Sequence, residues 1–178
     1  MWVSVDFDAP YSTCIGDNQS AETKLVRTFG RGTILAASVL LLTYLNYGGN
    51  CKQAFRFYEE HLGGKITMMM THDQQPNPSE VSPDWKNAIL HARISIGETE
   101  LMGADVPPDR FQPMRSAYLS LIVNSTEEAE RIYALLTDGG QIFMPMEETF
   151  FAVRFAMLRD KFGTSWMILH ERPRPQSV

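Results

Sequence analysis

The clearest structural signal in this chain is the stretch Asn50-Cys-Lys-Gln-Ala-Phe-Arg-Phe-Tyr-Glu-Glu-His-Leu-Gly-Gly64, because a stretch of the same design recurs later. Asn50 is a residue type that caps helices, and Gln53 stands where a capping box has its second member. Apolar residues follow at helical spacing up to Leu62, and Gly63-Gly64 is typical of a helix end. We therefore predict a helix that begins after Asn50 and ends before Gly63.

The second stretch of this design begins at Ser125, which forms a capping box with Glu128. It ends at Gly139-Gly140, and its apolar stripe consists of Ala129, Ile132, Tyr133 and Leu136. Ser125 lies 75 positions after Asn50, and Gly139 lies 76 positions after Gly63. Two helices with the same cap and stop at an almost constant offset indicate an internal repeat.

Runs of apolar and alternating residues flank both helices and predict four strands in each half. The predicted strands are 41–47, 65–70, 87–96 and 99–103 in the first half, and 117–123, 141–146, 150–158 and 164–170 in the second. Each half therefore reads βαβββ, and a linker with three prolines at 106–113 separates them. We predict an α+β fold in which two βαβββ modules form a curved mixed sheet with a concave pocket.

The predicted domain covers residues 39–172, with modules at about 39–105 and 114–172, and is followed by a tail of residues 173–178. We expect the N-terminal extension, residues 1–38, to be poorly ordered, because residues 6–22 are polar and show no sustained period. The apolar run 33–45 is too short to span a bilayer as a helix. A signal peptide is disfavoured because a long polar stretch precedes the basic residues of this run. We expect no membrane association.

The composition of the 178-residue chain excludes some partners and favours one compartment. It carries 16 Lys and Arg against 21 Asp and Glu, so there is no basic excess to neutralise a nucleic-acid backbone. Its two cysteines, Cys14 and Cys51, form neither a disulfide framework nor a CxxC pair. This usage suits a reducing cytoplasm.

Several motifs of the predicted domain resemble one superfamily. They are the run from Tyr44 to Tyr58 with the following Leu62-Gly-Gly, the strand His91-Ala-Arg-Ile-Ser-Ile-Gly97 with Leu101, Met102 and Asp105, and Asp160-Lys-Phe-Gly-Thr-Ser-Trp-Met167. They are similar to the PhnB-like branch of the glyoxalase/bleomycin-resistance/extradiol-dioxygenase superfamily, also named the vicinal oxygen chelate (VOC) superfamily. This branch carries a 3-demethylubiquinone methyltransferase name. The resemblance implies the doubled βαβββ fold and a homodimer.

Enzymes of this superfamily hold a divalent metal ion with four side chains, typically His or Glu, one from each of four inner strands. The resemblance places these four positions on Thr43, Met102, Tyr118 and Met167. Hydroxyl, phenol and thioether groups are poor ligands for zinc and for hard cations. We therefore predict no metal site and no cofactor.

Alternation along residues 87–96 places His91 and Arg93 opposite Ala92 and Ile94, so that both point into the predicted concavity. The same reasoning on the other strands completes a mixed wall. The predicted ligand-binding residues are Thr43, Tyr47, His91, Arg93, Met102, Tyr118, Ser120, Arg154 and Met167. Aromatic and arginine contacts of this kind suit a small, moderately polar organic ligand.

Three functions fit this pattern. The first is metal-independent binding of such a ligand, as the resemblance to bleomycin-resistance members implies. The second is a glyoxalase-type enzyme, or another lyase or oxidoreductase, that uses His91 or Tyr118 as acid or base. The third is a scaffold protein whose groove is filled by its own side chains. The sequence leaves open whether the protein is an enzyme, and His91 also fits a purely structural role with its hydrogen bonds satisfied.

Overall fold

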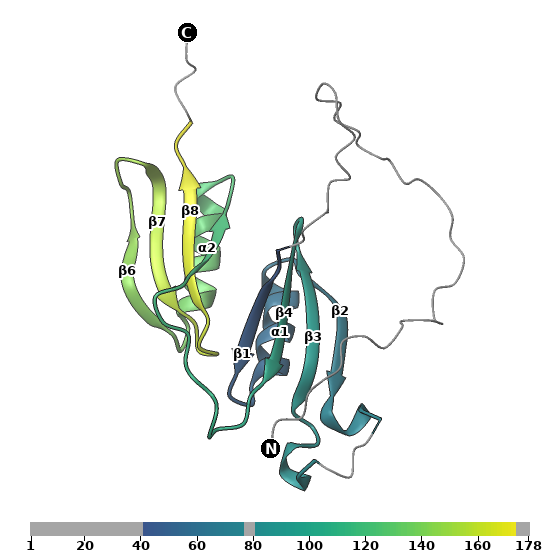
Figure 1. Cartoon of the computed structure of the whole chain (residues 1–178). Helices are drawn as coiled ribbons and strands as arrows, with labels where there is room; N and C mark the ends of the chain where they lie inside the picture. The colour runs from purple at the N-terminus through teal and green to yellow at the C-terminus, as the bar shows by residue number, and fades with distance from the viewer. Residues whose placement is uncertain (1–40, 77–80, 174–178) are drawn as a thin grey trace, which may run out of the picture. The chain divides into compact units, whose positions relative to one another are not determined.

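A computed structural model describes residues 41–76 and 81–173 of the chain (Figure 1). The predicted disorder of residues 1–38 and almost all of the predicted tail fall outside the described residues. Among the helices of the described residues, none is long and apolar enough to cross a membrane.

The predicted βαβββ repeat is confirmed in both halves of the chain. The first module consists of β1 (Thr43–Tyr47), α1 (Cys51–His61), β2 (Lys65–Thr71), β3 (Ile89–Ile96) and β4 (Thr99–Asp105). The second consists of β5 (Leu119–Ile122), α2 (Thr126–Thr137), β6 (Gln141–Glu147), β7 (Ala152–Arg159) and β8 (Ser165–Glu171). Two short 3-10 turns, His72–Gln74 and Pro83–Trp85, lie in the connection between β2 and β3.

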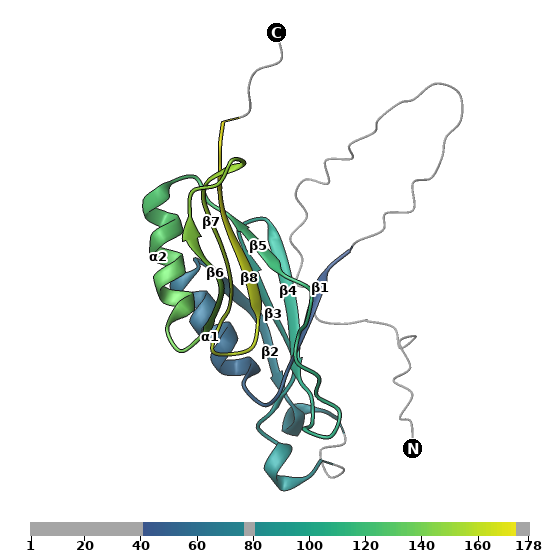
Figure 2. The ribbon, with the colours of Figure 1, turned by 90° about the vertical axis from the view of Figure 1, so that its left-hand side faces the viewer.

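Each module forms its own four-stranded mixed sheet, and the two sheets have the same topology. The strand orders are β1-β4-β3-β2 and β5-β8-β7-β6, with the first strand of each module parallel to the last and the other neighbours antiparallel. In Figure 2 both helices lie on the same side of the strands. We call the sheet surface opposite α1 the first open face and the surface opposite α2 the second open face.

The two helices begin in different ways. On α2 the Ser125 hydroxyl accepts a hydrogen bond from the Glu128 N–H at 3.1 Å, which is one half of the predicted capping box. The Glu128 carboxylate, which would supply the other half, pairs with Arg131 instead. On α1 the Asn50 side chain makes no capping hydrogen bond, so that prediction is wrong. The Asp105 carboxylate at the end of β4 takes its place, accepting from the N–H groups of Gly49 (3.0 Å) and Cys51 (2.9 Å). A carboxylate is a stronger hydrogen-bond acceptor than an amide, and its negative charge interacts favourably with the positive end of the helix dipole.

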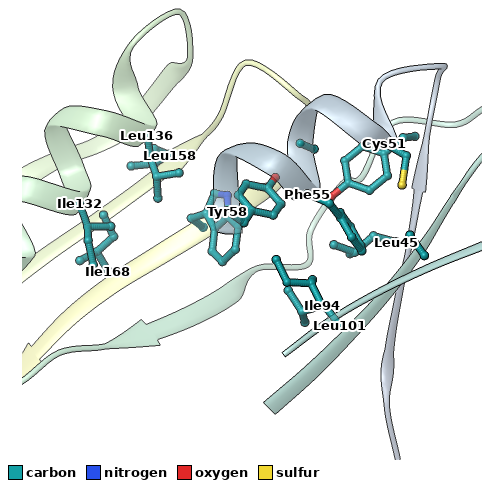
Figure 3. Close-up of a cluster of buried hydrophobic side chains, with 14 of the residues drawn as sticks. Leu45, Cys51, Phe55, Tyr58, Ile94, Leu101, Ile132, Leu136, Leu158 and Ile168 are labelled. Carbon is teal, nitrogen blue, oxygen red and sulfur yellow. The ribbon is translucent and has the colours of Figure 1, made fainter. Parts of the chain in front are cut away.

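Side chains from both modules meet in one buried core beneath the helices (Figure 3). Its apolar part includes Phe55, Ile94 and Leu101 from the first module and Ile132, Leu136, Leu158 and Ile168 from the second.

Asp160 ties the modules together at a buried polar centre and is 4% exposed. One carboxylate oxygen, Oδ2, accepts hydrogen bonds from the Tyr58 hydroxyl of α1 (2.6 Å) and from the Trp166 indole N–H (2.8 Å). The other carboxylate oxygen accepts from the backbone N–H groups of Phe162 (2.9 Å) and Thr164 (3.0 Å). Four donors on one buried carboxylate compensate for its removal from water.

Candidate ligand-binding site

The first open face presents a cluster of polar side chains that comes from three neighbouring strands. On β3, Ala92 and Ile94 are buried, and His91 and Arg93 therefore lie on the opposite, open face, as predicted. Tyr44 of β1 joins them: its hydroxyl lies 3.2 Å from His91 Nδ1, and the two rings stack with centroids 5.7 Å apart. Glu100 of β4 completes the cluster, with a carboxylate oxygen 3.2 Å from an Arg93 terminal nitrogen.

The hydrogen bonds of this cluster set the direction in which each proton points. Arg93 Nε always carries a hydrogen, and it donates to His91 Nε2 at 3.4 Å. A neutral His91 therefore carries its hydrogen on Nδ1 and donates it to the Tyr44 oxygen. Consequently the Tyr44 O–H is left to donate to a ligand. Tyr44 is 47% exposed, which leaves this hydrogen accessible.

The charge state of the cluster follows from its surroundings. Burial, and then the Arg93 charge, lower the pKa of His91 against the opposing effect of Glu100. Burial raises the pKa of Tyr44. At neutral pH the imidazole is therefore uncharged and the phenol keeps its proton. The Arg93–Glu100 pair leaves the cluster near electrical neutrality, which favours a polar but weakly charged ligand.

Methionine thioethers surround the polar cluster on the first open face. The strand register sets Met68 and Met102 on either side of Arg93, and Met70 beside His91. Thioethers on flexible side chains adapt to ligands of varied shape. This face thus combines a few directional hydrogen-bonding groups with soft apolar surroundings, as small-molecule sites do.

A cavity of about 560 Å³ brings together three predicted site residues from both modules: Thr43 of β1, and Tyr118 and Ser120 of the second module. The rest of its lining is mainly apolar and consists of Ile96, Gly97, Thr99, Leu101, Leu119, Leu121, Ile122 and Trp166. The Tyr118 ring also meets Phe143 edge-on at 6.2 Å. Met167 lies in register with Ser120 on the neighbouring strand β8.

The predicted inward positions of Tyr47 and Arg154 are wrong. Tyr47 is 2% exposed; its hydroxyl lies 3.1 Å from Thr164 Oγ1, and its ring packs edge-on against Phe55 of α1. Arg154 donates from Nε to Glu130 of α2 at 2.7 Å, so it lies on the helix side of its sheet. On β1 and β7 the helices cover the opposite set of residues from the predicted one, and β7 also has a register shift between Ala152 and Arg154. Thr43 alternates with Leu45 and Tyr47 and pairs with buried Leu101, so it too lies on the helix side of its strand and not on the first open face. The same inversion brings Tyr44, which sequence reasoning missed, onto the open face.

Two further histidines, His72 and His170, lie away from this cluster. Burial lowers the pKa of His72, and its Nε2 atom is buried. His170 is partly buried, and its Nδ1 lies 3.4 Å from Thr126 Oγ1 at the start of α2.

The four positions that carry metal ligands in VOC enzymes do not fit a divalent ion in this chain. Thr43 and Tyr118 line the cavity, whereas Met102 and Met167 belong to the sheets of different modules. Their hydroxyl, phenol and thioether groups lack the carboxylate, imidazole or thiolate donors that zinc and hard cations need. Within residues 41–76 and 81–173, no three His, Cys, Asp or Glu side chains gather in a way that could hold a metal.

Comparison with known proteins gives a consistent set of relatives. A family model described as 3-demethylubiquinone-9 3-methyltransferase matches residues 40–169. Protein YjdN of Escherichia coli (strain K12) is 30% identical over 145 residues, covering 76% of this chain and 97% of that protein. Protein PA1353 from Pseudomonas aeruginosa is 37% identical, with a TM-score of 0.69, over 76% of this chain and 100% of the other. A glyoxylase/bleomycin resistance protein/dioxygenase domain from Frankia sp. EAN1pec, 17% identical, shares the fold with a TM-score of 0.54 over 76% of this chain and 98% of that one.

Proposed function

The chain belongs to the 3-demethylubiquinone-9 3-methyltransferase-like (PhnB-like) family and has the VOC fold, and from this premise we propose that it binds a small, moderately polar organic ligand without a metal ion. The ligand would lie on the first open face, on the cluster formed by Tyr44, His91 and Arg93. The reducing cytoplasm is the compartment that we propose, because Cys51 is a free thiol in the core.

The observation that carries the proposal is the directed donor at Tyr44. The chain of hydrogen bonds from Arg93 through His91 leaves the Tyr44 O–H free to donate to a ligand. A ligand with a carbonyl, ether or hydroxyl oxygen would accept this hydrogen, and its apolar part would contact the thioethers of Met68 and Met102. Binding sites of this kind obtain specificity from a few fixed polar groups and affinity from apolar contact.

Metal independence is supported by the donor chemistry at Thr43, Met102, Tyr118 and Met167. None of the four supplies a group that a divalent ion prefers. Elemental analysis of protein purified without added metal tests this part directly. Near-stoichiometric zinc, nickel, iron or manganese would contradict it.

We propose that a second copy of the chain completes the site, because both open faces expose apolar side chains. Met68 of the first sheet is 38% exposed, and Ile122 of the second is 62% exposed. Apolar surface of this extent on soluble proteins marks interfaces. Sedimentation velocity of the full chain tests this: a homodimer is expected, and a monomer at all micromolar concentrations would refute it.

Binding is tested with a fragment library that contains oxygen acceptors, using thermal shift and ligand-observed NMR. Tyr44→Phe removes only the donor oxygen, and we expect it to weaken a bound fragment by about tenfold. Tyr133→Phe on α2 is the matched control and should leave affinity unchanged. Equal affinities of the wild type and Tyr44→Phe would refute the role of the directed donor.

Acid or base catalysis by His91 is the second candidate function. The lowered pKa leaves this imidazole uncharged at neutral pH, and it could act as a base once Nε2 exchanges its long, 3.4 Å hydrogen bond from Arg93 for one to the ligand. Fragments that bind are therefore followed by NMR for slow chemical conversion. Conversion that is lost in His91→Gln while binding persists would establish the enzyme; conversion unaffected by this change would exclude His91 as the base.

A further inference from the structure

A second cavity, of about 440 Å³, lies in the first module between the β2–β3 connection and the linker that follows β4. The connection contributes His72, Ser82 and Trp85, and the linker contributes Pro107, Pro108 and Arg110. None of the side chains assigned to the open-face site lines this cavity. It is therefore a separate site from the one proposed on the first open face.

Backbone hydrogen bonds hold both walls of the cavity in place. The His72 N–H donates to the Ala88 carbonyl, and the Ala88 N–H donates to the Trp85 carbonyl, each at 3.1 Å. These bonds hold the backbone that carries the two aromatic rings of the wall, whose centroids lie 6.5 Å apart. On the other side, the Arg110 N–H donates to the Pro107 carbonyl at 2.9 Å. Walls that are already ordered reduce the entropy lost when a ligand binds.

Two buried nitrogen atoms and one exposed guanidinium group around this cavity lack a partner among the described residues. His72 Nε2 and Trp85 Nε1 are buried, and neither finds a hydrogen bond among the residues that the structure describes. The Arg110 guanidinium likewise makes no ion pair or hydrogen bond within ranges 41–76 and 81–173. Buried polar atoms are normally paired, so atoms left without a partner at a cavity indicate where a ligand would supply one.

We propose that this cavity binds a small organic carboxylate that carries a flat ring. The carboxylate accepts from the Trp85 indole N–H and from the Arg110 guanidinium, a pairing that arginine makes strongly with planar oxyanions. The ring packs against the indole and the two adjacent prolines, Pro107 and Pro108. Burial lowers the pKa of His72, so its imidazole is uncharged and Arg110 supplies the positive charge.

Benzoate is the probe, and the Trp85 indole signal in a ¹H–¹⁵N NMR spectrum of the full chain is the readout. Trp85→Phe assigns that signal against those of Trp2 and Trp166. We expect benzoate to shift the Trp85 signal in a saturable way, and benzamide, which has the same shape without the charge, to bind about tenfold more weakly.

Arg110→Gln should weaken benzoate binding by about tenfold and leave benzamide binding unchanged. Arg115→Gln, a change at another exposed arginine between β4 and β5, is the matched control and should leave both unchanged. Because Arg110 is exposed, its replacement should not disturb folding, and unchanged positions of the other indole signals verify this. The proposal is overturned if benzoate fails to shift the Trp85 signal or if Arg110→Gln binds benzoate as the wild type does.

Discussion

The buried carboxylate of Asp160 predicts that two tyrosines at equivalent positions of the repeat contribute very differently to stability. Tyr58 of α1 is fully buried, and its hydroxyl donates to Asp160 at 2.6 Å. Removing a hydrogen bond to a charged group costs about 1.5–3 kcal/mol. Tyr133 stands 75 positions later on α2, and its hydroxyl makes no hydrogen bond with any described residue. Tyr58→Phe should therefore lower the free energy of unfolding by about 2 kcal/mol, and Tyr133→Phe by less than about 0.5 kcal/mol.

Urea unfolding followed by far-UV circular dichroism measures both differences. The two substitutions remove the same oxygen from the same ring, so differences in hydrophobic burial largely cancel. Each variant is measured at several protein concentrations, because dimerisation would add to apparent stability. The reasoning is refuted if the two variants lose equal stability, or if Tyr58→Phe leaves the midpoint where it is.

Three further predictions concern a cap, a histidine and a thiol. Asp105→Asn should lower the free energy of unfolding by about 2–4 kcal/mol, because an amide NH₂ group would face backbone N–H donors. Asn50→Ala should lower it by less than about 1 kcal/mol, since it removes only one hydrogen bond to a loop carbonyl. The reverse order of the two effects in urea unfolding would show that the capping group is misassigned. The NMR titration midpoint of His91 should lie below 6.5 and rise in Arg93→Gln. Because the folded pKa is depressed, this group's contribution to stability is present above pH 6.5 and lost as pH falls, and a midpoint above 6.5 would contradict the burial argument. Burial also raises the pKa of Cys51, so iodoacetamide at pH 8 should leave this thiol unmodified in the folded protein and alkylate it in urea. Peptide mass spectrometry measures the modification. Rapid alkylation without urea would disprove the burial of Cys51.

The repeat made the fold predictable, because its signals are local. Caps, apolar spacing and terminal glycines lie within a few residues of the helices they define, and Gly63 and Gly139 indeed have φ values of +68° and +70°. Strand ends differ from the prediction by only one or two residues at most positions. The first strand of each module is shorter than predicted, beginning at Thr43 and Leu119.

Parts of the site were less predictable because they depend on contacts distant in sequence. Alternation along a strand shows which residues share a face, but not which face a helix covers. It therefore predicted the face of His91 and Arg93, where the other face is wholly apolar, and failed to predict the faces of Tyr47 and Arg154. The partner of Arg154, Glu130, lies on a helix, and its position follows only from the packed fold.

The different caps of the two helices have a consequence for the order of folding. The cap of α2 comes from Ser125, immediately before the helix, so this helix can be stabilised as soon as its own segment exists. The cap of α1 is Asp105, 54 residues beyond Cys51, and it reaches the helix only after β4 has joined the sheet beside β1. Contacts between distant residues form late because closing the intervening loop costs entropy. The two halves of the repeat, nearly identical in pattern, should therefore acquire their helices at different stages, with α2 ordered early and α1 secured only when its module is complete.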